Sequence, residues 1–175
     1  MERKLLLLGL LRMHSMHGYL VLEHFESRAA MPITFKKPTV YNMLSKMKAD
    51  GWVVVREEQE GKRPPRSVYE ITEAGEAAFQ SLLRDEVGSY TEAEFPSVVS
   101  LAFLDLLPRH EAKVLLEQRH AQIEDRLREV NASIGELDMP IHAGSALLPL
   151  RYLQRHYMAE MELLEDIIKG LSEIE

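Results

Sequence analysis

The feature that most constrains this chain is a pair of regular apolar seams in its C-terminal half. The first seam alternates steps of four and three residues: Leu116, His120, Ile123, Leu127, Val130, Ile134 and Leu137. The second seam has nearly the same spacing: Leu150, Leu153, Tyr157, Met161, Leu164, Ile168 and Leu171. Such steps place side chains along one side of a helix and are typical of coiled-coil packing. The sequence therefore predicts two long amphipathic helices.

The segment Asp138–Gly144 is expected to connect these two helices, which would allow them to pair antiparallel. A shorter apolar helix is expected over residues 96–106. The segments Val98–Leu107 and Ala143–Tyr152 add more apolar surface than one helical hairpin covers. We therefore expect both seams to support a homodimer. A monomeric intramolecular bundle is the alternative.

The N-terminal half begins with helix patterns. Helices are expected over three segments: residues 2–13, 18–25 and 37–50. In the third, Val40, Leu44 and Met47 fall on one face, which should be buried. Pro38 suits the first turn of this helix, and Gly51 suits its end.

Two strand patterns follow, at Trp52–Glu58 and Ser67–Thr72, and the turn between them is unusual. Pro64 and Pro65 lack N–H donors and restrict φ, so this turn is stiff and cannot extend a ladder of hydrogen bonds. Three cations surround the proline pair: Lys62, Arg63 and Arg66. The pattern predicts a rigid cationic wing. Thr72 should then cap a fourth helix.

Charge is distributed unevenly along the chain, whose formal net charge is −7 at pH 7. The segment Lys36–Arg66 carries 8 basic and 4 acidic residues, whereas the C-terminal half is strongly acidic. A local basic surface is what phosphate binding requires, and the total charge is secondary. The acidic half should face away from any bound DNA.

Several other kinds of protein are disfavoured. The chain has no cysteine, which excludes disulfides and thiolate metal sites and fits the cytoplasm. The apolar run Leu5–Leu11 is too short to span a membrane. His14 and His17 fall in an expected turn without further metal ligands, so no metal or other cofactor is expected. No arrangement of catalytic residues is present, so an enzyme is not expected.

Five ordered segments of the N-terminal half carry a family resemblance: Leu5–Leu11, Met16-His-Gly-Tyr-Leu20, Pro38-Thr-Val-Tyr-Asn-Met-Leu44, Ala49-Asp-Gly-Trp52 and Gly61–Gly75. In these segments the chain resembles the PadR-like transcriptional regulators. The C-terminal half resembles the helical dimerisation region of that family by pattern. Its length is similar to that of members with a long C-terminal region, including virulence-gene activators.

The resemblance implies a mainly α fold with a small β-wing. Residues 1–89 would form a winged helix-turn-helix DNA-binding domain, and residues 90–175 an α-helical, coiled-coil-like dimerisation domain. It implies a cytoplasmic regulator, most often a repressor, that acts as a homodimer on a palindromic operator in double-stranded DNA. A small aromatic or amphipathic effector is a family expectation. No membrane partner is expected.

The helix over residues 37–50 is the expected recognition helix, because its outer face has no large aliphatic residue. Asn42 could bind adenine through two hydrogen bonds, and Lys46 could reach guanine or a phosphate. The set of expected DNA-binding residues is Tyr19, Lys36, Lys37, Thr39, Tyr41, Asn42, Ser45, Lys46, Lys62, Arg63 and Arg66. For Tyr19, packing within the protein is an equal alternative.

Some features keep two interpretations. His120 either sets the register of its seam or lies partly exposed at the seam edge. Four residues near the last helix either line an aromatic pocket or pack in a dimer core: His142, Tyr152, His156 and Tyr157. The alternative functions are a transcriptional activator and a protein-interaction module that retains the winged-helix fold.

Overall fold

The computed structural model describes residues 1–18, 20–21, 23, 36–59, 66–137 and 147–173. The chain divides after Glu92 into two compact units, which are described separately. Within the described ranges, no helix is both long and apolar enough to cross a membrane.

The helices of the first unit include α1 (Glu2–Met13), α3 (Lys37–Ala49) and α4 (Glu73–Gly88). Residues 18, 20, 21 and 23 are also helical, whereas Leu22 and Phe25 of the expected second helix lie outside the described residues. The predicted apolar face of α3 is confirmed, because Val40, Leu44 and Met47 are fully buried. Their spacing of four and three residues places them on one face.

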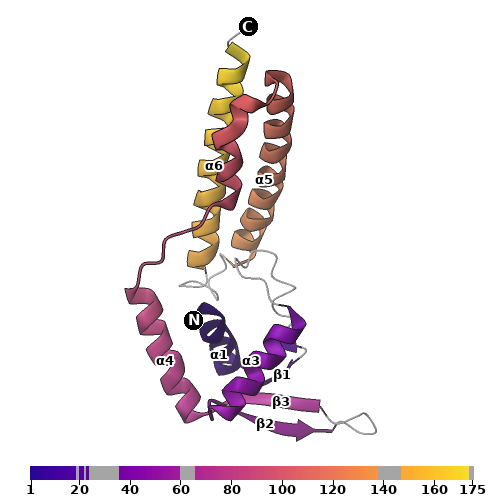
Figure 1. Cartoon of the computed structure of the whole chain (residues 1–175). Coiled ribbons are helices and arrows are strands. Elements are labelled where there is room, and N and C mark those ends of the chain that lie inside the picture. The colour runs from indigo at the N-terminus through magenta and orange to yellow at the C-terminus, as the bar shows by residue number, and fades with distance from the viewer. Residues whose placement is uncertain (19, 22, 24–35, 60–65, 138–146, 174–175) are drawn as a thin grey trace. The chain divides into compact units, whose positions relative to one another are not determined.

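A three-stranded antiparallel sheet joins these helices in the order β1-β3-β2. The strands are β1 (Met16–His17), β2 (Val53–Glu58) and β3 (Arg66–Ile71). The β2–β3 pairing runs from Val53 opposite Ile71 to Glu58 opposite Arg66. In Figure 1 these two strands extend side by side away from α1, α3 and α4. The expected hairpin is therefore present.

Strand β1 was not expected, because residues 14–17 were predicted to form a turn. The prediction was wrong for Met16 and His17, which lie opposite Tyr69 and Val68 of β3. A strand of two residues is too short to show an alternation of apolar and polar positions. Its pairing depends on β3, which is distant in sequence.

Short connections define the end of α3 and the start of α4. Gly51 has a φ of 73°, a left-handed conformation that glycine adopts without a steric penalty, and it follows the C-cap residue Asp50. The Thr72 hydroxyl accepts a hydrogen bond from the backbone N–H of Gly75 at 3.0 Å, as expected for an N-cap. Glu73 and Glu76 lie in the first turn of α4, where the helix dipole favours acidic residues.

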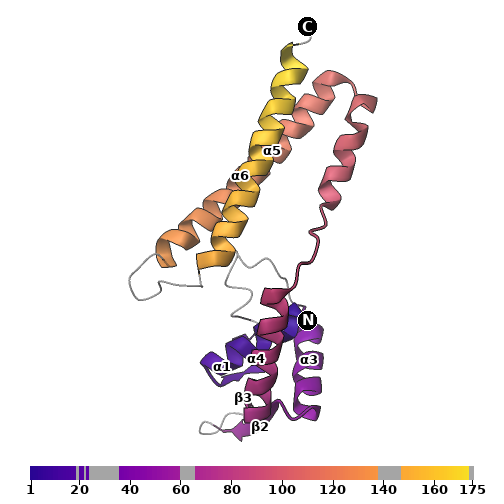
Figure 2. The ribbon, with the colours of Figure 1, turned by 90° about the vertical axis from the view of Figure 1, so that its left-hand side faces the viewer.

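The second unit contains η1 (Pro96–Leu106), α5 (Arg109–Leu137) and α6 (Leu148–Glu173). The long helices α5 and α6 lie side by side and antiparallel in both views (Figures 1 and 2). The predicted short helix is present, but it is a 3₁₀-helix. Leu101 and Leu104 of η1 pack against the hairpin. A repeat of three residues per turn aligns these two side chains.

The two seams meet within the chain. Leu116, Ile123 and Leu164 form one buried cluster, against which Met161, Ile168 and Leu171 pack. A second cluster contains Val130, Leu147 and Leu150, against which Ile134, Leu153 and Tyr157 pack. Leu127 and His120 are half-buried. The seams therefore hold α5 against α6 in a single copy of the chain.

Candidate nucleic-acid interface

Helix α3 presents a polar face opposite its buried one. Lys36, Lys37, Asn42, Ser45 and Lys46 are all exposed, whereas Thr39 and Tyr41 are half-buried. An exposed face with amide, hydroxyl and ammonium groups offers both hydrogen-bond donors and acceptors. Groups of this kind read base edges in the major groove and contact phosphates.

The start of α3 is suited to an anion. Lys36 is the N-cap residue, no side chain caps the helix, and the first turn contains no acidic residue. The positive end of the helix dipole is therefore not offset locally, and Lys36 and Lys37 add charge beside it. Lys46 and Lys48 lie in the last turn, where the dipole favours cations.

Tyr41 packs inside the first unit as well as flanking the outer face. A Cβ added to Gly18 would lie 2.9 Å from Cε1 of Tyr41 and 3.3 Å from Cε2 of Tyr69. Only glycine allows this close approach without a shift of the rings. Burial raises the pKa of Tyr69, and the neighbouring Tyr41 raises it further. Tyr19 lies outside the described residues.

Helix α3 is joined to the base of the wing by a tight connection. The backbone N–H of Trp52 donates to the carbonyl of Met47 at 2.9 Å, and that of Thr72 donates to the carbonyl of Trp52 at 3.0 Å. The Thr72 hydroxyl also donates to the carbonyl of Gly51 at 2.7 Å. These bonds fix the end of α3 to β2, β3 and the start of α4. A stiff connection of this kind limits how far the wing can move relative to α3.

Glycine is required at the start of α4 for the same connection. A Cβ added to Gly75 would lie 2.0 Å from the carbonyl oxygen of Trp52. On α1, the Lys4 ammonium lies 5.0 Å from the centre of the Trp52 ring, a cation–π contact. Sequence reasoning matched Trp52 to a family segment but did not assign it this central position. Its contacts come from segments far apart in the chain.

The described part of the wing includes one of its three predicted cations. Arg66 is exposed and lies opposite Glu58 in the β2–β3 pairing. Lys62 and Arg63 lie outside the described residues. Arg56 on β2 was not singled out from the sequence, and its guanidinium lies 3.1 Å from the carboxylate of Glu70. The β2–β3 strands therefore carry one more cation, which is paired with an acidic residue.

A known protein family matches the part of the chain that contains α3 and the wing. Residues 7–81 match the Transcriptional regulator PadR-like family. Over these residues the chain is similar to the PadR-like family. The family consists of transcriptional regulators rather than enzymes, which agrees with the expectation from the sequence. A relative from Bacillus subtilis (strain 168), the Negative transcriptional regulator PadR, is 26% identical over 128 residues, or 70% of this chain and 69% of the relative.

Solved structures show that the PadR-like fold extends over the whole chain. Bacillus subtilis PadR in complex with operator DNA matches with a TM-score of 0.86 and 20% identity, over 98% of this chain and 99% of that one. The same protein in complex with p-coumaric acid matches with a TM-score of 0.78 and 20% identity, over 97% and 94%. The Vibrio cholerae virulence activator AphA matches with a TM-score of 0.73 and 16% identity, over 98% and 99%.

The helical unit of this PadR-like chain holds a polar cluster that the sequence did not reveal. Arg119 forms an ion pair with Glu160, with its Nε 3.0 Å from the carboxylate. Its Nη1 donates to the backbone carbonyl of Ser97 at 3.0 Å. Arg119 therefore ties the start of η1 to both α5 and α6. Nothing in the seam spacing indicates this bond.

The histidines and tyrosines near α6 have different surroundings. Nε2 of His120 lies 3.0 Å from Oε1 of Glu165, so this half-buried seam residue is paired across the hairpin. The His156 ring is tilted against Phe95, 5.6 Å away between centroids. Tyr157 packs in the seam, whereas Tyr152 is 69% exposed. The rings of His156 and Tyr157 are neighbours, 5.7 Å apart between centroids. His142 lies outside the described residues.

Proposed function

We propose that this PadR-like protein is a homodimeric repressor that binds a palindromic operator. The observation that carries this proposal is the exposed polar face of α3 beside a wing that is fixed to the same helix. The name of the Bacillus subtilis relative, a negative regulator, supports repression. A repressor of this kind would block transcription by occupying the promoter.

In this proposal α3 enters the major groove. Asn42 accepts from and donates to adenine, and Lys46 donates to guanine or to a phosphate. Ser45 and Thr39 contact the DNA from the same face, while Tyr41 positions the helix from its edge. Lys36 and Lys37 bind phosphates at the start of the helix. These contacts would select the operator sequence.

The wing would bind the DNA backbone or the adjacent minor groove. Its proposed contacts are Lys62, Arg63 and Arg66. The two prolines of this turn lower the entropy that is lost when the tip is held against DNA. Cations at a narrow minor groove gain from its enhanced negative potential. The wing therefore adds affinity with little dependence on sequence.

The second unit would join two copies, so that two α3 helices reach major grooves about 34–36 Å apart. The exposed apolar residues of this unit support such pairing, with Leu106 of η1 80% exposed and Phe103 60% exposed. The seams contribute by holding α5 and α6 together as the surface that pairs. The p-coumaric acid complex of the Bacillus subtilis protein supports a small aromatic effector here too.

The recognition claim is tested with single-site variants of α3 in gel-shift titrations against the operator and a scrambled sequence. Asn42→Ala and Lys46→Ala should each lower operator affinity by about 5- to 150-fold, as expected for the loss of about 1–3 kcal/mol. Lys48→Ala is the matched control, because Lys48 is exposed on the same helix but flanks the outer face. Equal losses for Lys46→Ala and Lys48→Ala would contradict the assigned face.

The wing claim has a different signature. Arg63→Ala should weaken binding to operator and scrambled DNA alike and reduce the salt slope by about one. Binding that is unchanged in an Arg63→Ala/Arg66→Ala variant would overturn the assignment. Adding p-coumaric acid to the same titrations tests the effector, which should release the operator complex.

A protein-interaction module is the competing function, and the exposed apolar residues of η1 favour it as much as they favour a dimer. That function predicts no affinity for DNA even at low salt. Retention on heparin and binding to nonspecific DNA across salt concentrations separate the two. An activator would bind DNA through the same interface, so a promoter-reporter assay with the operator distinguishes activation from repression.

A further inference from the structure

The first turn of η1 is not held in place by apolar packing. None of the residues of η1 is buried, and residues 96–100 are all exposed. The second half of η1 packs against the α5–α6 hairpin through Leu101 and Leu104. Burial of apolar side chains therefore contributes little to the position of the first turn.

Two contacts from the hairpin hold this first turn instead. Nη1 of Arg119 on α5 donates to the backbone carbonyl of Ser97 at 3.0 Å. The ring of His156 on α6 lies 5.6 Å from that of Phe95, the N-cap residue of η1. Both contacts are supported by Glu160, whose Oε1 accepts from Arg119 and whose Oε2 lies 3.9 Å from Nε2 of His156. One carboxylate of α6 therefore orients both side chains that reach η1.

The shape of the arginine side chain matters for this arrangement. Nε and Nη2 of Arg119 donate to Glu160, while Nη1 donates in another direction, to Ser97. The rigid fork of a guanidinium allows this division, whereas the compact ammonium of a lysine does not. The side chains of the ion pair are only 19% and 20% exposed, so water weakens their attraction less than at an open surface.

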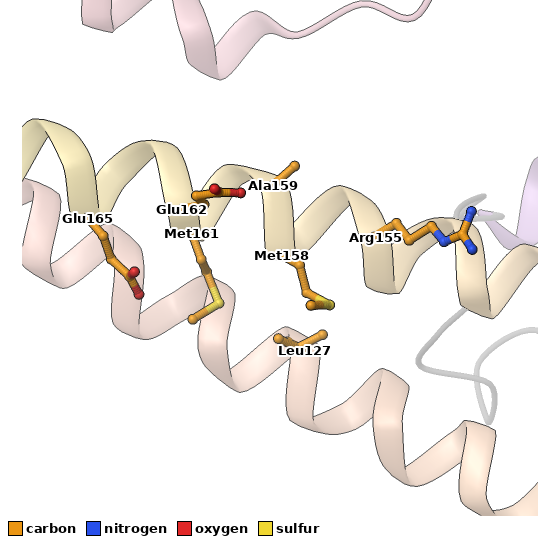
Figure 3. A pocket seen from close by; sticks show the side chains of 7 residues that line it. All are labelled: Leu127, Arg155, Met158, Ala159, Met161, Glu162 and Glu165. Atoms are coloured by element: carbon orange, nitrogen blue, oxygen red, sulfur yellow. The ribbon is translucent and has the colours of Figure 1, made fainter.

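The two long helices have other contacts that hold them together. Figure 3 shows a groove at which Met158 and Met161 of α6 point toward Leu127 of α5, whereas the charged Arg155 extends away from it. The two buried clusters of the seams are likewise apolar. Because α5 and α6 pair through apolar side chains, the distinct contribution of the partly buried ion pair is its bond to η1.

The first turn of η1 lies at the end of an exposed connector. Helix α4 ends at Gly88 and η1 begins at Pro96, and residues 89–95 between them are all exposed. Packing therefore does not fix the course of this segment. An extended chain spans at most about 3.3–3.6 Å per residue, so holding the far end of the connector limits the movement that it allows.

We infer that Arg119, oriented by Glu160, is a positioning residue for operator binding. By holding the first turn of η1, it shortens the free chain between the DNA-binding unit and the hairpin. In a bivalent complex, a shorter connector raises the effective concentration of the second DNA-binding unit at the matching spacing and lowers it at other spacings. The inference rests on the proposed function and adds the group that sets which half-site spacings are tolerated.

Duplexes of altered spacing test this role. The probe is a palindromic duplex that the unmodified chain selects from a random-sequence pool. Its binding is compared, by fluorescence anisotropy, with that of its single half-site and of a spaced duplex with two extra central base pairs. The insertion moves the half-sites about 7 Å further apart and rotates them by about 70°. The unmodified chain should prefer the original spacing by at least about tenfold.

Arg119→Lys keeps the positive charge but loses the forked geometry. It should weaken binding to the palindromic duplex by about tenfold, leave binding to the half-site unchanged, and lower the preference for the original spacing at least about threefold. Phe95→Ala is a second variant that should change this preference in the same direction. Because Phe95 is 49% exposed, its removal should leave the fold intact, which circular dichroism checks.

The matched control is Ser100→Ala. The hydroxyl of Ser100 donates to the same carbonyl of Ser97 at 2.9 Å, but from within η1 rather than from the hairpin. This variant should keep the preference for the original spacing. A loss of that preference equal to the loss in Arg119→Lys would overturn the inference, because the effect would then arise within η1 itself.

The remaining outcomes separate the inference from the proposed function. If the unmodified chain selects no duplex, or binds the palindromic duplex no more tightly than the half-site, the proposed function fails and the inference fails with it. If that chain prefers the palindromic duplex but Arg119→Lys and Phe95→Ala keep its spacing preference, the function stands and the positioning role is overturned. Equal losses on the half-site and the palindromic duplex would assign Arg119 to stability alone and also overturn the role.

Discussion

The two units bury their apolar residues in different ways. In the first unit Leu7, Leu8, Leu44 and Met47 are fully buried, and the surrounding segments come from both helices and strands. In the second unit Leu164 is fully buried, but the same unit exposes many large apolar side chains. The comparison suggests that the first unit completes its own core, whereas the second leaves apolar surface for a partner. If the proposed function holds, variants of the first unit should weaken DNA binding and variants of the second unit should weaken the proposed pairing.

The largest effect on stability is expected at Gly75 of the first unit, where the packing leaves no room for an added Cβ. Gly75→Ala would place a Cβ 2.0 Å from the carbonyl oxygen of Trp52, so the backbone must move. We expect this variant to lose the cooperative unfolding of the first unit. Trp52 is the single tryptophan of the chain, so its fluorescence in urea reports on that unit alone.

Gly135→Ala provides the matched glycine control in the second unit. Apart from the neighbouring backbone of α5, no atom of the described residues lies within 4 Å of a Cβ added there. Replacing a glycine inside a helix by alanine should stabilise α5 by roughly 0.5–1 kcal/mol. A Gly75→Ala variant that unfolds like the unmodified chain would show that the first unit is less tightly packed than its contacts indicate.

The next largest effect is on the free energy of unfolding, and it should depend on protein concentration in one unit but not in the other. Leu44→Ala creates a cavity in the first unit and should cost about 2–5 kcal/mol at any protein concentration. Leu164→Ala should cost a similar amount in the α5–α6 hairpin. Its effect on thermal unfolding should depend on protein concentration, because the proposed dimer would add stability by mass action. Unfolding curves at protein concentrations a hundredfold apart distinguish the two. If unfolding of both variants depends on protein concentration in the same way, the two units do not differ in how they bury their apolar residues.

A smaller effect is expected at the connection between the wing and α4. Thr72→Ala removes the cap of α4 and the bond to the carbonyl of Gly51, which should cost about 0.5–2 kcal/mol. Thr72→Ser retains a hydroxyl and is the conservative control. Because Thr72 also helps fix the wing, the alanine variant should bind operator DNA more weakly at a temperature where it is folded.

The smallest effect is a pH dependence between α1 and α4. Hydrogen bonds from Gln80 and then Arg12 hold the pKa of Glu76 below its ordinary value of 4.5. A lowered pKa in the folded state contributes stability above the unfolded value, and this stability is lost as the pH falls through the folded value. Glu76→Gln should therefore narrow the stability difference between pH 7 and pH 3. Because this carboxylate is exposed, the change should be smaller than that of Thr72→Ala.

Local sequence patterns predicted most of the first unit. The buried face of α3, the end at Gly51, the cap at Thr72 and the strands of the wing depend on residues within a few positions of one another. The polar face of the candidate site follows from the same pattern, since Asn42 and Lys46 lie opposite the buried positions. Strand β1 was missed because two residues carry no periodic signal.

Other features depend on contacts between distant segments. The close approach of Gly18 to Tyr41, the position of Trp52 beside Gly75, and the bond from Arg119 to Ser97 each join parts of the chain that local patterns treat separately. The 3₁₀ form of η1 could not be predicted either, because an apolar run alone does not distinguish three from 3.6 residues per turn.

By itself, the sequence determined the α-helices, the strands β2 and β3, and the faces that they bury, because spacing along the chain fixes which side chains share a face. It did not determine strand β1 or the 3₁₀ form of η1. It also determined that the two seams are long and regular. Only the tertiary structure decided that these seams meet within one copy. Apolar spacing is the same whether the neighbouring helix is in the same chain or in another, and only the packed hairpin shows which residues remain exposed.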